Sequence, residues 1–119
     1  MRAGPSQDEI RRLNLGVLLR YVHVHGPTSR AELTARLGLN RSTIGALTAD
    51  LTAAGLVREE LPRGHGRAGR PSLVVRPEPG IHVFAVTVDA DLVTAARVGL
   101  GGVILDRGDA PRPRGDAAP

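Results

Sequence analysis

Two short segments, each opening with a helix N-cap and closing near a glycine, constrain this chain more than any other feature. Ser29-Arg-Ala-Glu32 has the spacing of a capping box, and Gly38 suits the left-handed conformation that ends many helices. Asn40 is a favourable N-cap for the next helix, which is expected to run to about Ala54. Because only a short turn separates the two helices, the segment predicts a helix-turn-helix.

A longer helix is predicted ahead of this unit, from about Gln7 to Val24. Ser6 opens a second capping box, and Gly26-Pro27 disfavours continuation of the helix. Spacings of three and four residues predict one buried face on this first helix, made of Ile10, Leu13, Val17, Leu18, Tyr21 and Val24. The same spacing assigns to the core of the third helix Ile44, Leu47, Thr48 and Leu51.

A β-hairpin is predicted after the third helix. Residues 56–61 and 72–76 have the composition of strands, and the segment between them is rich in glycine and arginine. Three helices followed by such a hairpin predict a winged helix-turn-helix over residues 1–77.

A second region is predicted after the Pro77-Glu-Pro-Gly80 linker. Residues 81–89, 92–98 and 103–105 resemble short strands, so residues 78–106 are expected to form a small β-meander. Residues 107–119 are rich in proline, glycine and charge and are expected to be disordered. The predicted fold class is therefore α+β.

Charge is divided unevenly between these two regions. Residues 1–77 hold 12 arginines and 6 acidic residues, whereas residues 78–119 hold 4 arginines and 6 acidic residues. A basic region joined to a mildly acidic one favours a domain that binds a polyanion. A genome that prefers arginine to lysine would explain the choice of residue but not this asymmetry.

The second helix of a helix-turn-helix normally enters the major groove of duplex DNA. Its opening residues are Asn40, Arg41, Ser42 and Thr43, and small side chains at Gly45 and Ala46 would allow close approach to the bases. Arg41 is suited to guanine, and Asn40 to adenine or a phosphate. The start of the preceding helix, at Ser29 and Arg30, is suited to a phosphate. Three wing arginines are expected to reach the DNA backbone or a minor groove: Arg63, Arg67 and Arg70.

Each of these assignments has a structural alternative. Ser29 and Asn40 are expected to act as helix caps whether or not they contact DNA. Arg41 would otherwise be a solvated surface charge, and the wing arginines a basic loop.

The sequence gives little support for a nucleotide site, a metal site or a catalytic site. Residues 64–69 match G-x-G-x-x-G, but a dinucleotide site needs a preceding parallel strand and a following helix, so no nucleotide or other cofactor is expected. The scattered histidines predict no metal site, the pair Asp89 and Asp91 is expected to lie in a turn, and no catalytic set is evident. Because no catalytic set is evident, the chain is not expected to be an enzyme. It has no cysteine and no apolar run long enough to span a membrane, so it is expected to be cytoplasmic.

The motifs together resemble regulators of the ROK family (repressors, open reading frames and kinases). The matching residues are Arg12-Leu-Asn14, Val17-Leu18, Gly26-Pro-Thr-Ser-Arg-Ala-Glu-Leu33, Gly38-Leu-Asn-Arg-Ser-Thr-Ile44, Leu51, Gly55-Leu-Val57 and Gly69-Arg-Pro71. The resemblance is close over residues 12–71 and looser over residues 81–106.

This resemblance implies a repressor of carbohydrate genes that binds double-stranded DNA and forms dimers or larger assemblies. It also implies that Val83 to Leu105 corresponds to the opening strands of an actin-like, sugar-sensing domain, present here only as a remnant. The kinase branch of the family has a glycine-rich phosphate turn after its first strand. Asp89 is instead followed by Ala90-Asp91-Leu92, so neither phosphate binding nor a sugar effector is expected for this chain.

Two further functions remain open alternatives. A truncated sugar-kinase-like protein would bind ATP, and a winged helix that docks proteins would tolerate charge reversal at Arg41 and Arg67 without any effect on DNA. An unused gene fragment is a further alternative.

Overall fold

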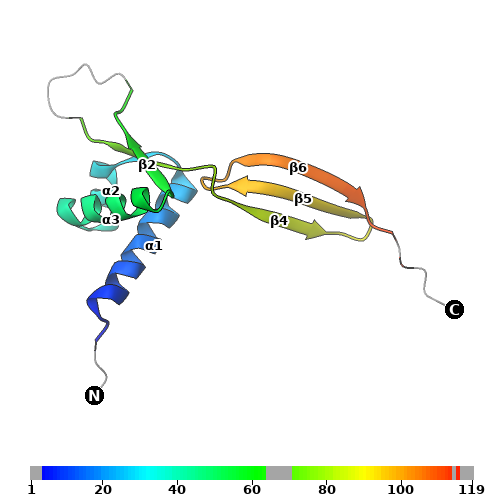
Figure 1. Cartoon of the computed structure of the whole chain (residues 1–119), viewed down its shortest axis with the longest axis horizontal. Helices are drawn as coiled ribbons and strands as arrows, with labels where there is room; N and C mark the ends of the chain where they lie inside the picture. Colours follow the sequence, from blue (N-terminus) through cyan, green and yellow to red (C-terminus); the bar gives the residue numbers. More distant parts are fainter. Residues whose placement is uncertain (1–3, 64–70, 114, 116–119) are drawn as a thin grey trace.

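Three helices, a small sheet beside them and a second sheet that extends away make up the chain (Figure 1). The structure, a computed structural model, describes residues 4–63, 71–113 and 115. None of the helices in this described part is long and apolar enough to cross a membrane.

The helices begin and end close to where their caps predict. They are α1 (Gln7–His25), α2 (Arg30–Leu37) and α3 (Arg41–Ala53). The Ser6 hydroxyl accepts a hydrogen bond from the amide of Glu9, and Gly38 ends α2 with a φ of 67°. That φ lies in the left-handed region, which glycine adopts without the steric cost that a Cβ would bring.

The first sheet contains the predicted hairpin and one unpredicted strand. The hairpin consists of β2 (Val57–Glu60) and β3 (Val74–Pro77), paired antiparallel. The additional strand, β1 (Thr28–Ser29), pairs with the other edge of β3 and gives the order β1-β3-β2. A strand of two residues is too short to show the alternation by which strands are found in a sequence.

The core lies between the three helices and the first sheet. Its buried members are Leu18, Val22, Leu33, Ile44, Leu47, Leu51, Val57 and Val75. The core residues predicted for α3 are confirmed. They include Thr48, whose buried hydroxyl donates to the Ile44 carbonyl at 2.7 Å and is thereby compensated for its loss of water.

The buried face predicted for α1 is mostly wrong. Leu18 is buried and Tyr21 packs against the core, as predicted, but the other four members are exposed, with exposed fractions of 42% at Ile10, 67% at Leu13, 42% at Val17 and 63% at Val24. A second apolar series with helical spacing packs on the core instead, made of Leu15, Leu18, Leu19 and Val22. Helix α1 therefore has two apolar faces, and periodicity alone cannot say which one the core covers.

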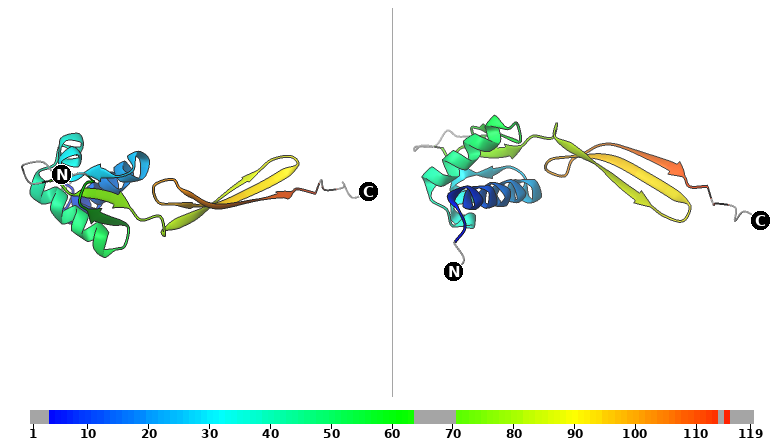
Figure 2. Two further views of the ribbon diagram at one scale, coloured as in Figure 1. Left: turned by 90° about the horizontal axis from the view of Figure 1, so that it is seen from above. Right: turned by 60° about the horizontal axis from the view of Figure 1, so that its bottom comes forward.

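The second sheet is antiparallel, in the order β4-β5-β6, and it extends away from the helices in both views of Figure 2. Its strands are β4 (His82–Val88), β5 (Leu92–Gly99) and β6 (Ile104–Pro111). The predicted turn at residues 89–91 is confirmed by the bounds of β4 and β5.

Strand β6 corrects the prediction that residues 107–119 are disordered, since it continues to Pro111. Strand β6 pairs with β5, and its charged side chains include one that forms an ion pair across the two strands. Arg97 of β5 forms an ion pair with Asp106 at 2.6 Å, and this guanidinium lowers the pKa of the Asp106 carboxyl. Cross-strand pairs of this kind cannot be recognised from the composition of one segment, so the segment was not predicted as a strand.

The linker after β3 connects the two sheets, and the loop between β5 and β6 contacts the end of α1. The Gly101 amide donates to Nδ1 of His23, near the end of α1, at 2.9 Å. The Glu78 amide donates to the Leu56 carbonyl, also at 2.9 Å.

Candidate nucleic-acid interface

The first turn of α3 is organised by Asn40. Its side-chain oxygen accepts hydrogen bonds from the Thr43 amide and the Ser42 hydroxyl, both at 2.8 Å. The Oδ1 atom of Asn40 is thereby used in capping the helix. The side-chain NH₂ group of Asn40 donates to no partner among the described residues. The cap predicted for Asn40 is confirmed, and its amide donors are the groups that could contact a base or phosphate.

Arg41 follows the cap and is exposed. Within the described residues its guanidinium forms neither an ion pair nor a side-chain hydrogen bond. Gly45 lies one turn further along the helix and Ala46 is exposed beside it. The start of α3 thus combines one uncompensated positive charge with small side chains.

Arg30, at the start of α2, has a partner within the protein. Its Nε and Nη2 atoms donate to the two carboxylate oxygens of Glu59 on β2, with 2.5 Å between Nη2 and Oε1. These hydrogen bonds raise the pKa of Arg30. A Cβ built on Gly45 would stand 3.4 Å from Nη1 of Arg30, so a side chain at this position would lie in van der Waals contact with the guanidinium.

The first amides of α2 are also engaged internally. The Arg30 amide donates to the Leu73 carbonyl, the Ala31 amide to the Ser72 hydroxyl and the Glu32 amide to the Ser29 hydroxyl. A phosphate at this helix start, as the sequence suggested, would have to displace one of these hydrogen bonds or bind through side chains alone. The cap predicted for Ser29 is confirmed.

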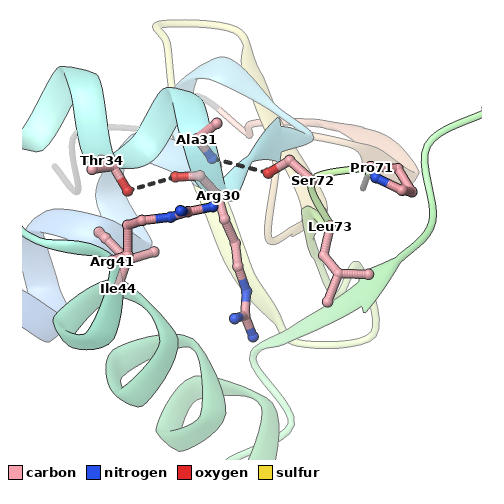
Figure 3. Close-up of a pocket in the computed structure, with 8 residues that line it drawn as sticks. All are labelled: Arg30, Ala31, Thr34, Arg41, Ile44, Pro71, Ser72 and Leu73. Carbon is pink, nitrogen blue, oxygen red and sulfur yellow. Dashed lines mark hydrogen bonds between the residues drawn. The ribbon is translucent and has the colours of Figure 1, made fainter. Parts of the chain in front are cut away.

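A groove of about 550 Å³ separates α2, the start of α3 and the chain entering β3 (Figure 3). It is lined by Arg30, Ala31, Thr34, Arg41, Ile44, Pro71, Ser72 and Leu73. One dashed bond in Figure 3 joins α2 to the chain entering β3, since the Ala31 amide donates to the Ser72 hydroxyl, whereas the other lies within α2, where the Thr34 hydroxyl donates to the Arg30 carbonyl. Hydrogen bonds from the Arg30 and Ala31 amides therefore join α2 to the chain entering β3, beside the groove that Arg41 lines.

Most arginines on the strands of the wing are neutralised. Arg76 pairs with Glu60 at 2.6 Å and Arg58 with Glu78 at 3.7 Å. Arg63, at the end of the described part of the wing, is exposed and forms no ion pair with a described residue. Arg67, Arg70 and the G-x-G-x-x-G segment lie outside the described residues.

Sequence reasoning did not find Glu59 or Ser72. Both act on the start of α2 from distant positions in the chain, since Glu59 lies 29 residues from Arg30 and Ser72 lies 41 residues from Ala31. No local spacing rule connects residues so far apart.

Loss of the Glu59 carboxylate is expected to destabilise the wing. Glu59→Ala leaves the Arg30 guanidinium without its partner at a site where Glu59 is only 18% exposed. We expect the free energy of unfolding to fall by about 1–2 kcal/mol, between the values for exposed and buried ion pairs. Glu78→Ala removes an equal charge from a longer, more exposed pair and should cost less than about 1 kcal/mol. Urea denaturation followed by circular dichroism compares the two, and equal losses would contradict the structural role of Glu59.

Comparison with known proteins agrees with this architecture. The sequence profile of the MarR family matches residues 17–68. The xylose repressor of Bacillus spizizenii is 28% identical over 101 residues, which cover 84% of this chain and 26% of that protein. The xylose repressor of Bacillus subtilis is 27% identical over the same shares of both chains.

A solved structure is similar over most of the chain. It is a ROK-family transcriptional regulator described as a homologue of the E. coli Mlc protein, with a TM-score of 0.56 and 24% identity. The match covers 86% of this chain and 26% of that structure. The chain thus spans about a quarter of the length of each relative it matches.

The fold is a winged helix followed by a β-meander, and residues 17–68 of the winged helix are similar to the MarR family. The α+β fold class predicted from the sequence is confirmed. The resemblance to ROK-family regulators is confirmed as well, through the xylose repressors and the regulator structure.

Proposed function

We propose that this chain binds double-stranded DNA with α3 in the major groove and acts in transcriptional regulation. The observation that carries the proposal is Arg41, an exposed and unpaired guanidinium on the first turn of the second helix of a helix-turn-helix. The opening residues of that helix are the ones that meet base edges in proteins of this architecture. Neighbouring arginines that serve the fold, such as Arg30 and Arg76, are paired with carboxylates.

The proposed base-reading set is Arg41, Asn40, Ser42 and Thr43, with Gly45 and Ala46 allowing close approach. Ser29 and Arg30 are proposed to lie near the phosphate backbone while they keep their internal bonds. The wing arginines Arg63, Arg67 and Arg70 are proposed to contact the backbone or a minor groove.

The relatives refine the proposal. Two are named xylose repressors and one is named a transcriptional regulator. We propose that this chain likewise represses carbohydrate-related genes, acts in the cytoplasm and is not an enzyme. Residues 1–77 are proposed as the DNA-binding unit and residues 78–111 as the start of a second unit.

Binding to duplex DNA should depend on both sequence and salt. For a duplex enriched from a random pool, Arg41→Ala is expected to weaken binding by about 1–3 kcal/mol and to relax the preference at one base pair. Fluorescence anisotropy at several salt concentrations measures the affinity and the number of phosphate contacts, since each contact contributes about −0.9 to the logarithmic slope.

Arg36→Ala is the matched control. It removes the same charge from the last turn of α2, where Arg36 is exposed and forms only a 3.8 Å contact with Glu32. This variant should lose affinity weakly and equally for all sequences. Equal losses for the two variants would argue against base reading by Arg41. The absence of binding at low salt would favour a protein-docking module.

A further inference from the structure

A second groove, of about 390 Å³, lies between the first half of α1 and the start of α3. Its polar lining consists of Gln7, Arg11 and Asn14 from α1 and of Ser42 and Thr43 from α3, and we call it the amide groove. The DNA contacts proposed above use its two α3 residues but give no role to the side chains that α1 contributes.

Asn14 is the most informative residue of the amide groove. It is half-buried on α1, and its side chain forms no hydrogen bond with any residue that the structure describes. No buried side-chain nitrogen or oxygen in that part of the chain lacks a partner, so the Asn14 amide is open to the groove. Gln7, two turns nearer the start of α1, is exposed and its amide has no described partner either. Each amide can donate two hydrogen bonds to a bound acceptor.

Arg11 lies between these two amides and is already paired with a carboxylate. Its guanidinium forms an ion pair with Asp50 of α3, with side chains 48% and 43% exposed. The pair joins α1 to α3 and compensates the charge of Arg11. Asp8 and Glu9, the acidic residues of the first turn of α1, do not line the groove. The amide groove therefore offers hydrogen-bond donors with little net charge.

The amide groove and the groove beside Arg41 lie on opposite flanks of α3. Arg41 and Ile44 line one groove, whereas Ser42, Thr43 and Ala46 line the other. Successive residues of an α-helix are rotated by about 100°, which places these two sets on opposite sides of the helix axis. The face of α3 that is proposed to read bases lies between them.

We propose that the amide groove holds the sugar–phosphate backbone of one DNA strand, with Asn14 and Gln7 donating to phosphate oxygens. A helix with its side chains is about 10–12 Å across and the major groove is about 12 Å wide. A helix that reads bases therefore brings its two flanks against the two backbones that border the major groove. Side-chain amides are common donors to phosphates. This inference rests on the proposed DNA binding and extends the interface to the first helix.

Asn14→Ala tests the contact on a duplex enriched from a random pool. Fluorescence anisotropy should show about tenfold weaker binding, the lower end for a hydrogen bond to a charged group. The loss should be equal for all sequences, and the salt slope should stay unchanged, because a phosphate contact reads no base and the variant removes no charge. Urea denaturation should show stability at least equal to wild type, since alanine is the better helix former. A loss of stability that accounts for the weaker binding would overturn the contact.

Asn14→Asp replaces the donor by a carboxylate of nearly the same size. It should weaken binding at least ~30-fold, because the new charge faces a phosphate. Gly16→Asp is the matched control, since it adds the same charge to α1 at an exposed site that does not line the amide groove and where a Cβ would meet nothing within 4 Å. Its loss should stay below ~3-fold, because salt screens a distant exposed charge. Equal losses for the two variants would overturn the proposal.

Duplexes in which one phosphate at a time is replaced by an uncharged methylphosphonate identify the phosphate that is held. Replacement of the phosphate bound by Asn14 should weaken the wild type and affect Asn14→Ala at least ~5-fold less, as expected for two partners of one contact. Replacement of the other phosphates should affect both proteins alike. Identical profiles for the two proteins would overturn the proposal.

The same measurements separate this inference from the proposed function. If Arg41→Ala loses a base preference while Asn14→Ala binds as wild type does, the reading of bases by α3 stands and only the backbone contact in the amide groove is overturned. If the wild type binds no duplex at low salt, the proposed function and this inference both fail.

Discussion

Ile44→Ala is expected to lower the free energy of unfolding by about 2–5 kcal/mol, the range seen when a buried isoleucine is reduced to alanine. Ile44 is fully buried on α3 and belongs to the core cluster that all three helices share. A small domain has only about 5–15 kcal/mol of stability in total, so this loss should also reduce DNA binding at physiological temperature. Urea denaturation followed by circular dichroism gives the value directly.

Leu61→Ala is the control for that experiment. Leu61 is 56% exposed, and its truncation should change stability by less than about 0.5 kcal/mol. A loss at Ile44 no larger than the loss at Leu61 would mean that α3 is not packed as the structure describes.

Gly99→Ala is expected to disturb the junction between the linker and the second sheet. A Cβ at this position would stand 2.5 Å from the carbonyl oxygen of Pro79, which belongs to the backbone and cannot turn aside like a flexible side chain. Relieving that overlap requires a backbone shift, with a cost of about 1–3 kcal/mol. Amide hydrogen exchange should show faster exchange in β5 and at the Leu100 amide, which bonds to the Ile81 carbonyl.

Gly108→Ala is the matched control in the same sheet. Gly108 lies on β6, and a Cβ there would meet nothing within 4 Å. Its exchange pattern should remain close to wild type. If the two alanine variants behave alike, the close approach of β5 to Pro79 is not present in solution.

The sequence was sufficient for the helices because their signals are local. Ser6, Ser29, Asn40 and Gly38 act on backbone groups within a few residues, and the structure places helix ends where these residues predict. The hairpin of the wing follows from the same kind of evidence, because its two strands flank a segment rich in glycine.

Features that depend on distant residues could not be predicted. The core covers the side of α1 that carries Leu18 and Val22. Leu13 and Val24, which were expected on the same buried face as Leu18, are exposed, because the choice depends on where α3 and β3 pack. Strand β6 depends on cross-strand pairing with β5, which its composition did not reveal.

For the candidate site, the sequence identified Arg41 and the cap at Asn40, and the structure adds the internal partners of Arg30. The Arg30–Glu59 pair distinguishes an arginine that stabilises the wing from one that remains available to a ligand. Residue types alone could not make this distinction, since all 16 basic residues of the chain are arginine.

Selection from a random pool of duplex DNA tests the central claim most directly. The wild type and Arg41→Ala proteins are each used to enrich bound duplexes, which are then sequenced. If α3 reads bases in the major groove, the wild type should enrich a recurring short motif, and Arg41→Ala should lose the preference at one base pair, most simply a guanine, while the rest of the motif persists. No enriched motif with the wild type, or an identical motif with both proteins, would contradict the account.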